Sequence, residues 1–168
     1  MNIILIGFMG AGKSTVAKKI AEKIGDQLIE MDDLIVERSG RKDVAEIFEL
    51  DGEIRFREME IEIAKEISLM TNVVVSTGGG VIINRIILDY LRKTGTVVFL
   101  QTRFTEILSR IDRSGGRPLF QDKKKAKILF DFREVLYKEY SDLSVATDNR
   151  SVDEVAESVL SMLKNKRR

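Results

Sequence analysis

The sequence of 168 residues predicts a three-layer α/β domain built around a mainly parallel sheet. Short apolar runs alternate with helical patterns from end to end, and strands without an apolar–polar alternation are covered on both faces. Helices between such strands act as crossovers, so the strands run parallel. The length suits one domain, and we therefore expect residues 1–168 to form a single unit.

Each element follows from a local signal. Short apolar runs predict five strands, at residues 3–6, 27–30, 73–76, 97–100 and 143–146. Apolar residues at helical spacing predict helices at about 13–24, 32–38, 43–50, 53–70, 84–93, 104–112, 125–140 and 152–163. Asp32 or Asp33 can cap the second helix, and Gly40 ends it. Residues 113–118, which hold the only proline, are expected to be irregular, and the basic residues 164–168 to form a frayed tail.

The composition excludes several kinds of chemistry. Lys and Arg total 28 against 27 Asp and Glu, so there is no electrostatic basis for a nucleic-acid or membrane partner. The chain has no cysteine and no histidine, which rules out disulfides, thiol catalysis and a histidine base. A general base must therefore be a carboxylate, a lysine or a tyrosine. No signal-peptide pattern and no membrane-length apolar run is present, and we expect a cytoplasmic monomer.

The clearest motif is the stretch Gly7-Phe8-Met9-Gly10-Ala11-Gly12-Lys13-Ser14-Thr15, which fits the phosphate-binding pattern G-x-x-x-x-G-K-S/T. It follows a predicted strand and opens a predicted helix, as that loop requires. Glycines let backbone N–H groups converge on an anion, and the helix N-terminus adds partial positive charge. Lys13 can then reach the β- and γ-phosphates, while the Ser14 hydroxyl can bind Mg²⁺.

Acidic residues follow the second strand, at the same edge of the sheet. A carboxylate of Glu30, Asp32 or Asp33 can hold Mg²⁺ through water or take a proton from an attacking hydroxyl. The alternative for Asp33, and also for Asp32, is a helix cap. The residues themselves leave both interpretations open.

Two arginines have both a structural and a functional interpretation. Arg57 lies in the long helix between Glu53 and Glu60, where an exposed helical ion pair is the simpler explanation. The functional alternative is a guanidinium fork, oriented by Glu60, that binds a substrate carboxylate. Arg133 can present a second fork, although surface pairing with adjacent acidic residues is favoured when the residues are considered alone.

Glycine-rich segments mark two further places near the predicted site. Gly78, Gly79 and Gly80 directly follow a buried strand and indicate that the chain passes very close to a ligand. A loose connection is the alternative. The segment from Arg110 to Arg117 combines arginines and glycines, which suits a flap that closes over a triphosphate and excludes water.

Taken together, these motifs resemble those of the shikimate kinases, in order and with matching spacing over essentially the whole chain. The phosphate-binding loop is similar almost letter for letter. The other matching motifs are Arg38-Ser39-Gly40-Arg41, Ile47-Phe48, Gly52-Glu53, Phe56-Arg57 with Glu60, Thr77-Gly78-Gly79-Gly80, Arg117-Pro118-Leu119, and Arg133 with Leu136-Tyr137.

The resemblance implies a fold, a reaction and a set of residue roles. The fold would be that of nucleoside monophosphate kinases, with five parallel strands in the order 2-3-1-4-5. Substrate-binding helices would span about 32–62 and a lid about 112–124. The reaction would transfer the γ-phosphate of ATP to the 3-hydroxyl of shikimate, on the pathway to chorismate and aromatic amino acids.

The roles carry over by position in the motifs. Asp32 would orient or deprotonate the attacking hydroxyl, and Arg57 and Arg133 would bind the substrate carboxylate, next to the backbone of Gly78, Gly79 and Gly80. Gly10, Ala11, Gly12, Lys13, Ser14 and Thr15 would surround the phosphates, with Ser14 on Mg²⁺. Arg117 would reach ATP from the lid, and Arg110 and Arg150 would lie near the adenine.

The sequence departs from the family pattern at two positions. The family has Asp-x-Asp at the end of the second strand, where this chain has Glu30-Met31-Asp32. Glu30 can still hold a metal-bound water, but its extra methylene changes the reach. Val135 stands where the family often has a proline.

The predicted mechanism is direct in-line phosphoryl transfer without a covalent intermediate. Two alternatives remain: another small-molecule P-loop kinase, acting on gluconate or a nucleoside monophosphate, or a nucleotide-binding module without turnover.

Overall fold

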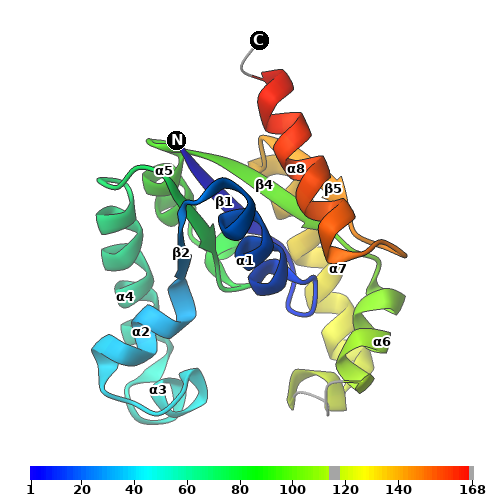
Figure 1. Cartoon of the computed structure of the whole chain (residues 1–168). Helices are drawn as coiled ribbons and strands as arrows, with labels where there is room; N and C mark the ends of the chain where they lie inside the picture. The colour runs from blue at the N-terminus through cyan, green and yellow to red at the C-terminus, as the bar shows by residue number, and fades with distance from the viewer. Residues whose placement is uncertain (114–117, 167–168) are drawn as a thin grey trace.

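The computed structural model describes residues 1–113 and 118–166 and confirms the alternation of strands and helices. Figure 1 shows the arrangement. The strands are β1 (Asn2–Ile6), β2 (Gln27–Glu30), β3 (Val73–Ser76), β4 (Gly95–Gln101) and β5 (Leu143–Ala146). The α-helices are α1 (Lys13–Ile24), α2 (Met31–Ser39), α3 (Val44–Leu50), α4 (Gly52–Ile67), α5 (Arg85–Arg92), α6 (Phe104–Arg113), α7 (Lys123–Tyr140) and α8 (Val152–Lys166).

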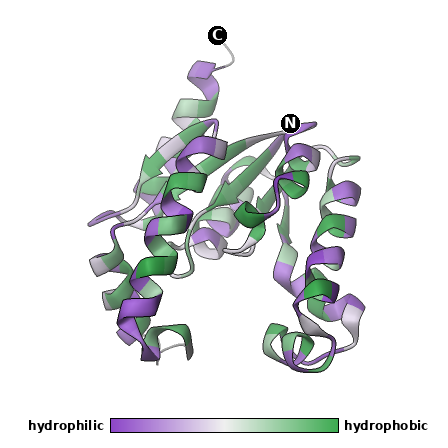
Figure 2. Ribbon diagram, turned by 180° about the vertical axis from the view of Figure 1, so that it is seen from behind, coloured by the Kyte–Doolittle hydropathy of each residue, from purple (hydrophilic) through white to green (hydrophobic). Residues whose placement is uncertain are grey.

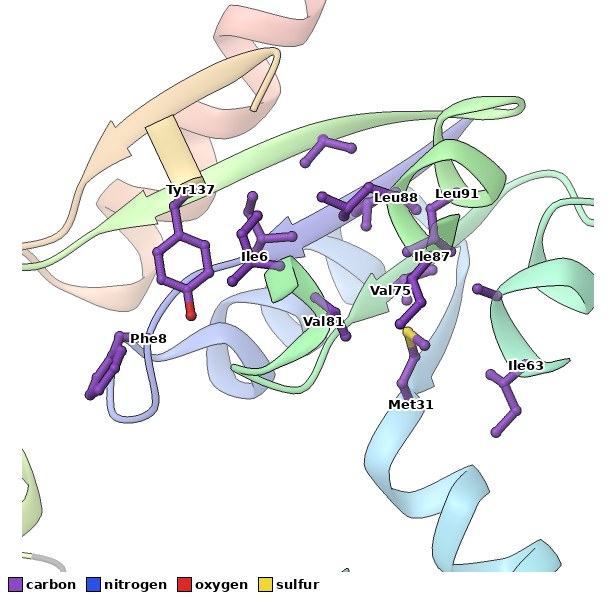
Figure 3. Packing of buried hydrophobic residues seen from close by; sticks show 14 of the residues in the cluster. Ile6, Phe8, Met31, Ile63, Val75, Val81, Ile87, Leu88, Leu91 and Tyr137 are labelled. Atoms are coloured by element: carbon purple, nitrogen blue, oxygen red, sulfur yellow. The ribbon is translucent and has the colours of Figure 1, made fainter. Parts of the chain in front are cut away.

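The strands form one parallel sheet in the order β2-β3-β1-β4-β5, as the resemblance implied. Alternate residues of β1 point to opposite faces: Ile3 and Leu5 pack with α1 and α8, whereas Ile4 and Ile6 pack with α4, α5 and α7. Both faces of the sheet are therefore covered, which explains why the strands are apolar throughout. Figure 2 shows the mostly hydrophobic strands between helices of mixed character, and Figure 3 shows part of the core on the α5 and α7 face.

Several predicted boundaries were wrong. α2 begins at Met31 with Glu30 as its N-cap residue, so Asp32 and Asp33 lie in the first turn and neither caps the helix. α8 continues to Lys166, whose Nζ lies 3.6 Å from Asp142, so this part of the basic tail is helical. Both ends of the segment expected to be irregular have regular structure, because α6 includes Arg113 and a 3₁₀ turn, η2 (Pro118–Gln121), begins at Pro118, while residues 114–117 lie outside the described part of the chain.

The short connection after β3 also has regular structure. A 3₁₀ turn, η1 (Val81–Ile83), follows the three glycines, and its first residues are buried. β4 begins at Gly95, earlier than expected, because its backbone pairs with Asn2. No helix in the described part of the chain is long and apolar enough to cross a membrane. The carboxyl ends of β1, β2 and β3 lie together, and the site is built there.

Candidate active site

The loop between β1 and α1 has a conformation that depends on glycine. Gly10 and Gly12 have φ angles of 82° and 91°, in the left-handed region where a side chain is strained. Gly12 is the N-cap residue of α1. The loop therefore places a helix N-terminus, with its partial positive charge, at the edge of the sheet where a phosphate is expected.

Lys13 is folded back over this loop. Its Nζ donates hydrogen bonds to the carbonyl oxygens of Gly7 at 2.8 Å and Phe8 at 3.1 Å, and the residue is only 8% exposed. The loop's own carbonyls thus hold the ammonium group beside the start of α1. A phosphate that enters the loop meets a cation that is already ordered, as P-loop chemistry requires.

Ser14, Glu30 and Ser76 place three oxygen-bearing side chains side by side. Ser14 Oγ donates to Glu30 Oε2 at 3.1 Å and lies 3.3 Å from Ser76 Oγ, while Glu30 and Ser76 are register partners of β2 and β3. Burial raises the pKa of Glu30, although hydrogen bonds from Ser76 and Ser14 act in the opposite direction. Hydroxyl and carboxylate oxygens suit Mg²⁺, so these residues fit the metal that the sequence predicts.

Asp32 lies in the first turn of α2 and faces the glycines that follow β3. A Cβ added at Gly78 would lie 2.7 Å from Asp32 Oδ1, so any larger residue would displace the carboxylate. The glycine segment is therefore packed closely against a side chain, which excludes a loose connection, and its close approach to a ligand stays a prediction. A negative charge in the first turn of a helix is also stabilised by the helix dipole.

These groups line a cavity of about 460 Å³ that joins the loop to the ends of β2 and β3. Lys13, Ser14, Glu30, Asp32 and Gly79 all contribute to its wall. The cavity brings a phosphate-binding loop within reach of a carboxylate that can act on a hydroxyl. This arrangement suits phosphoryl transfer to an alcohol.

Arg57 makes both ion pairs that its spacing predicted, and the pair with Glu53 is exposed, whereas the pair with Glu60 is not. Its Nη1 donates to Glu60 Oε2 at 2.6 Å and its Nη2 to Glu53 Oε1 at 3.1 Å, and the Glu60 side chain is 1% exposed. Burial raises the pKa of Glu60, against the opposing effect of Arg57. A Cβ at Gly80 would lie 2.7 Å from Arg57 Nη1, so the guanidinium rests against the glycine loop.

Arg133 is buried, and surface pairing with its acidic neighbours was the wrong interpretation. It is 8% exposed, its guanidinium carbon lies 5.9 Å from the Phe8 ring centroid, and its Nε makes no hydrogen bond within the described residues. Burial lowers its pKa, and the charge of Arg57 acts in the same direction. The positive charges of the two guanidinium groups therefore repel each other, and a bound anion would relieve this repulsion.

Arg110 and Arg150 border a second, smaller cavity beside the loop, together with Ala11, Gly12 and Thr15. The guanidinium of Arg110 donates to the carbonyl oxygens of Ala11 at 3.3 Å and Thr147 at 3.0 Å. Arg150 donates to the carbonyl oxygens of Ala146 and Glu154. The N–H groups of both arginines are thus engaged with backbone carbonyls of the cavity wall. A ligand in this cavity would mainly contact the flat face of each guanidinium.

Arg117, the predicted lid arginine, lies outside the described residues.

Two residues at the site were not predicted to be functional. Ser76 ends β3 next to the glycines, a polar position at the carboxyl edge that could have been noticed. Tyr137 entered only as part of a motif, and its hydroxyl donates to the Gly79 carbonyl at 2.6 Å.

The sheet order, the glycine loop and the adjoining cavity define a P-loop phosphotransferase. The protein-family model described as Shikimate kinase matches residues 9–164. The chain belongs to the shikimate kinase family.

Relatives and solved structures agree with this assignment over nearly the full chain. The shikimate kinase of Lactococcus lactis subsp. lactis is 42% identical over 161 residues, which cover 95% of this chain and 96% of the relative. A structure of shikimate kinase from Acinetobacter baumannii in complex with shikimate superposes with a TM-score of 0.90 at 32% identity, covering 98% of this chain and 93% of that one. The shikimate kinase structure from Aquifex aeolicus has a TM-score of 0.84 at 34% identity, covering 99% and 98%.

Proposed function

We propose that this chain transfers the γ-phosphate of ATP to the 3-hydroxyl of shikimate, giving shikimate 3-phosphate and ADP. The observation that carries the proposal is that Asp32 and Arg57 pack against the glycines that adjoin the phosphate loop, with the buried Arg133 beside Phe8 of that loop. An acceptor with a carboxylate and a neighbouring hydroxyl matches that set of groups. Family membership supports the same reaction.

The chain's own residues provide positioning and charge compensation. The loop from Gly10 to Thr15 surrounds the phosphates, and Lys13 neutralises charge that develops on the transferred group. Asp32 orients the attacking hydroxyl and accepts its proton, while Arg57 and Arg133 hold the carboxylate of the acceptor. Glu60 keeps the Arg57 fork in one orientation. We assign Arg117 to the lid that closes over ATP.

Ser14 would bind Mg²⁺ directly, and Glu30 would act through a water of its hydration shell. Bound there with the nucleotide, the ion supplies positive charge to the phosphate oxygens. Arg110 and Arg150 would flank the adenine. We also propose that the protein is a monomer with a cytoplasmic location.

A coupled assay of ADP release, with MgATP and one acceptor at a time, tests the proposal. Turnover with shikimate, and none with gluconate or nucleoside monophosphates, is the expected result. Phosphorylation of gluconate or a nucleotide while shikimate is inert would identify another small-molecule kinase. ATP binding without transfer to any acceptor would identify a nucleotide-binding module.

A further inference from the structure

Tyr137 is a buried tyrosine of α7 whose hydroxyl forms its hydrogen bond outside that helix. The residue is 1% exposed, and its ring stacks on Phe99 of β4 with centroids 5.2 Å apart. Its hydroxyl donates to the carbonyl oxygen of Gly79 at 2.6 Å. Figure 3 shows the hydroxyl oxygen directed away from α7. Both ends of the side chain are therefore held, one by the sheet and the other by the glycine loop.

The Tyr137 hydroxyl stays protonated and can therefore donate a hydrogen bond at all times. Burial raises the pKa of Tyr137 far above that of a solvated tyrosine, and the nearby charge of Arg133 only partly opposes this effect. The hydroxyl therefore keeps its proton at any pH at which the enzyme works. It serves as a fixed hydrogen-bond donor and takes no part in proton transfer.

The peptide that Tyr137 holds lies between the phosphate loop and the acceptor side of the site. A Cβ at Gly79 would lie 3.4 Å from the Met9 nitrogen and 3.6 Å from the Gly7 oxygen. Because a trans peptide is planar, a fixed Gly79 carbonyl also fixes the Gly80 N–H, which points the opposite way. Without side chains to restrict them, these glycines depend on outside contacts for their orientation.

Tyr137 also lies one helical turn after Arg133, on the same face of α7. We propose that Tyr137 is a positioning residue, which ties the Gly79–Gly80 peptide to the helix that carries Arg133, so that both contacts to the acceptor keep one fixed geometry. This inference rests on the proposed function, since it assigns Gly79 and Arg133 to acceptor binding. Tyr137 itself touches neither substrate.

The competing explanation is that Tyr137 only packs the core. Removal of its hydroxyl would then leave the Gly79 carbonyl short of a partner and lower stability, without a selective effect on either substrate. The two explanations differ in which Michaelis constant changes. A positioning role acts on shikimate, whereas a general loss of stability acts on neither substrate in particular.

The test compares Tyr137→Phe with Tyr140→Phe, which deletes a hydroxyl from the same helix at a half-buried position. We expect Tyr137→Phe to raise the KM for shikimate about tenfold, which is the effect expected from the loss of one hydrogen bond. The KM for MgATP should stay within about twofold of the wild type. Tyr140→Phe should change neither constant. Phe99→Leu, which loosens the ring stack but keeps the hydroxyl, should lower the melting temperature with little change in the KM for shikimate.

An unchanged KM for shikimate in Tyr137→Phe, or an equal rise in both constants, would overturn the inference. If Tyr137→Phe does not fold, 3-fluorotyrosine at position 137 keeps the ring and alters the strength of the donor. A change in the KM for shikimate alone then supports the inference, and identical constants contradict it. If the wild-type chain does not phosphorylate shikimate, the proposed function has failed, which is a separate result.

Discussion

Asp32 and Asp33 are adjacent carboxylates with different surroundings. Asp32 lines the cavity and faces Gly78, whereas Asp33 is exposed at the mouth of the same cavity. The chain has no histidine, so a base in the proposed reaction has to be a carboxylate, a lysine or a tyrosine, and these two carboxylates lie at the edge where the phosphate loop lies. The structure favours Asp32, because its oxygen is directed at the glycine loop that adjoins the phosphates.

Asp32→Asn should lower kcat by two or more orders of magnitude, on the order of what a positioned acid–base group contributes, while ATP still binds. Asparagine keeps the size of the side chain but cannot accept a proton. Steady-state kinetics and calorimetric titration with a non-hydrolysable ATP analogue measure the two effects. Asp33→Asn is the matched control and should retain nearly full turnover. Unchanged kcat in Asp32→Asn would remove it from the catalytic set.

Glu60 links the pH dependence of acceptor binding to that of folding. Burial raises its pKa, so it takes a proton at higher pH than a solvated glutamate does. Protonation weakens its hold on Arg57, and we therefore expect the KM for shikimate to rise as the pH falls from neutral to mildly acidic, while the KM for MgATP stays constant. Glu60→Gln should have a high KM for shikimate at every pH, without this rise. A rise of equal size in Glu60→Gln would point to another group.

The raised pKa of Glu60 also determines how this residue makes stability depend on pH. The folded chain binds this proton more tightly than the unfolded chain, so the contribution of Glu60 to the free energy of unfolding falls as the pH rises between the two pKa values. Glu60→Gln should abolish this contribution to the slope of the free energy of unfolding against pH, which denaturation experiments across the same pH range measure.

At the scale of elements, the glycines after β3 work together with α2 and α4. The carboxylate of α2 and the guanidinium of α4 each occupy the space that a Cβ would take, at Gly78 and Gly80 respectively. Gly80 has φ −93°, a conformation open to any residue, so its requirement is steric and comes from Arg57. The loop and the two helices therefore form one binding surface.

Gly80→Ala should raise the KM for shikimate about tenfold or more and change the free energy of unfolding by less than about 1 kcal/mol, because the flexible Arg57 fork can move away from the new methyl group. Kinetics and denaturant unfolding provide the two measurements. In Arg57→Ala the same glycine substitution should have a much smaller effect on the KM, since the clash is gone. Fully additive effects in the double variant would contradict this explanation.

At the scale of the whole molecule, Asn2 joins the elements at the end of the sheet opposite the site. It is fully buried, its Nδ2 donates to the Met70 carbonyl and the Thr94 hydroxyl at 2.9 Å each, and its Oδ1 accepts from the Val73 N–H at 3.3 Å. This one side chain ties β1 to the end of α4, to β3 and to the turn before β4. No sequence pattern marked it.

Asn2→Ala should lower the free energy of unfolding by about 2–4 kcal/mol, because one buried and two half-buried polar groups lose their partner. Both Michaelis constants should stay within twofold of the wild type, since the substitution is at the other end of the strands. Urea denaturation and steady-state kinetics test the two parts. A selective rise in either Michaelis constant would contradict this expectation and show that the end of the sheet around Asn2 influences substrate binding.

The sequence was sufficient for features that depend on neighbouring residues. The glycine loop, the strand before it and the helix after it follow from residues 3–24, because backbone conformation and periodicity are local properties. The ends of β2, β3 and β5 were likewise predicted, and the motifs in their order implied the family and the sheet order.

Only the tertiary structure decided the roles of side chains that meet from distant parts of the chain. Arg57 and Arg133 were best explained as surface pairs when each helix was considered alone, but packing half-buries Arg57 against Gly80 and buries Arg133 beside Phe8. Burial determines whether an ion pair is incidental or functional, because desolvation changes its strength and its pKa. That burial depends on which helices pack together, and no stretch of sequence contains that information.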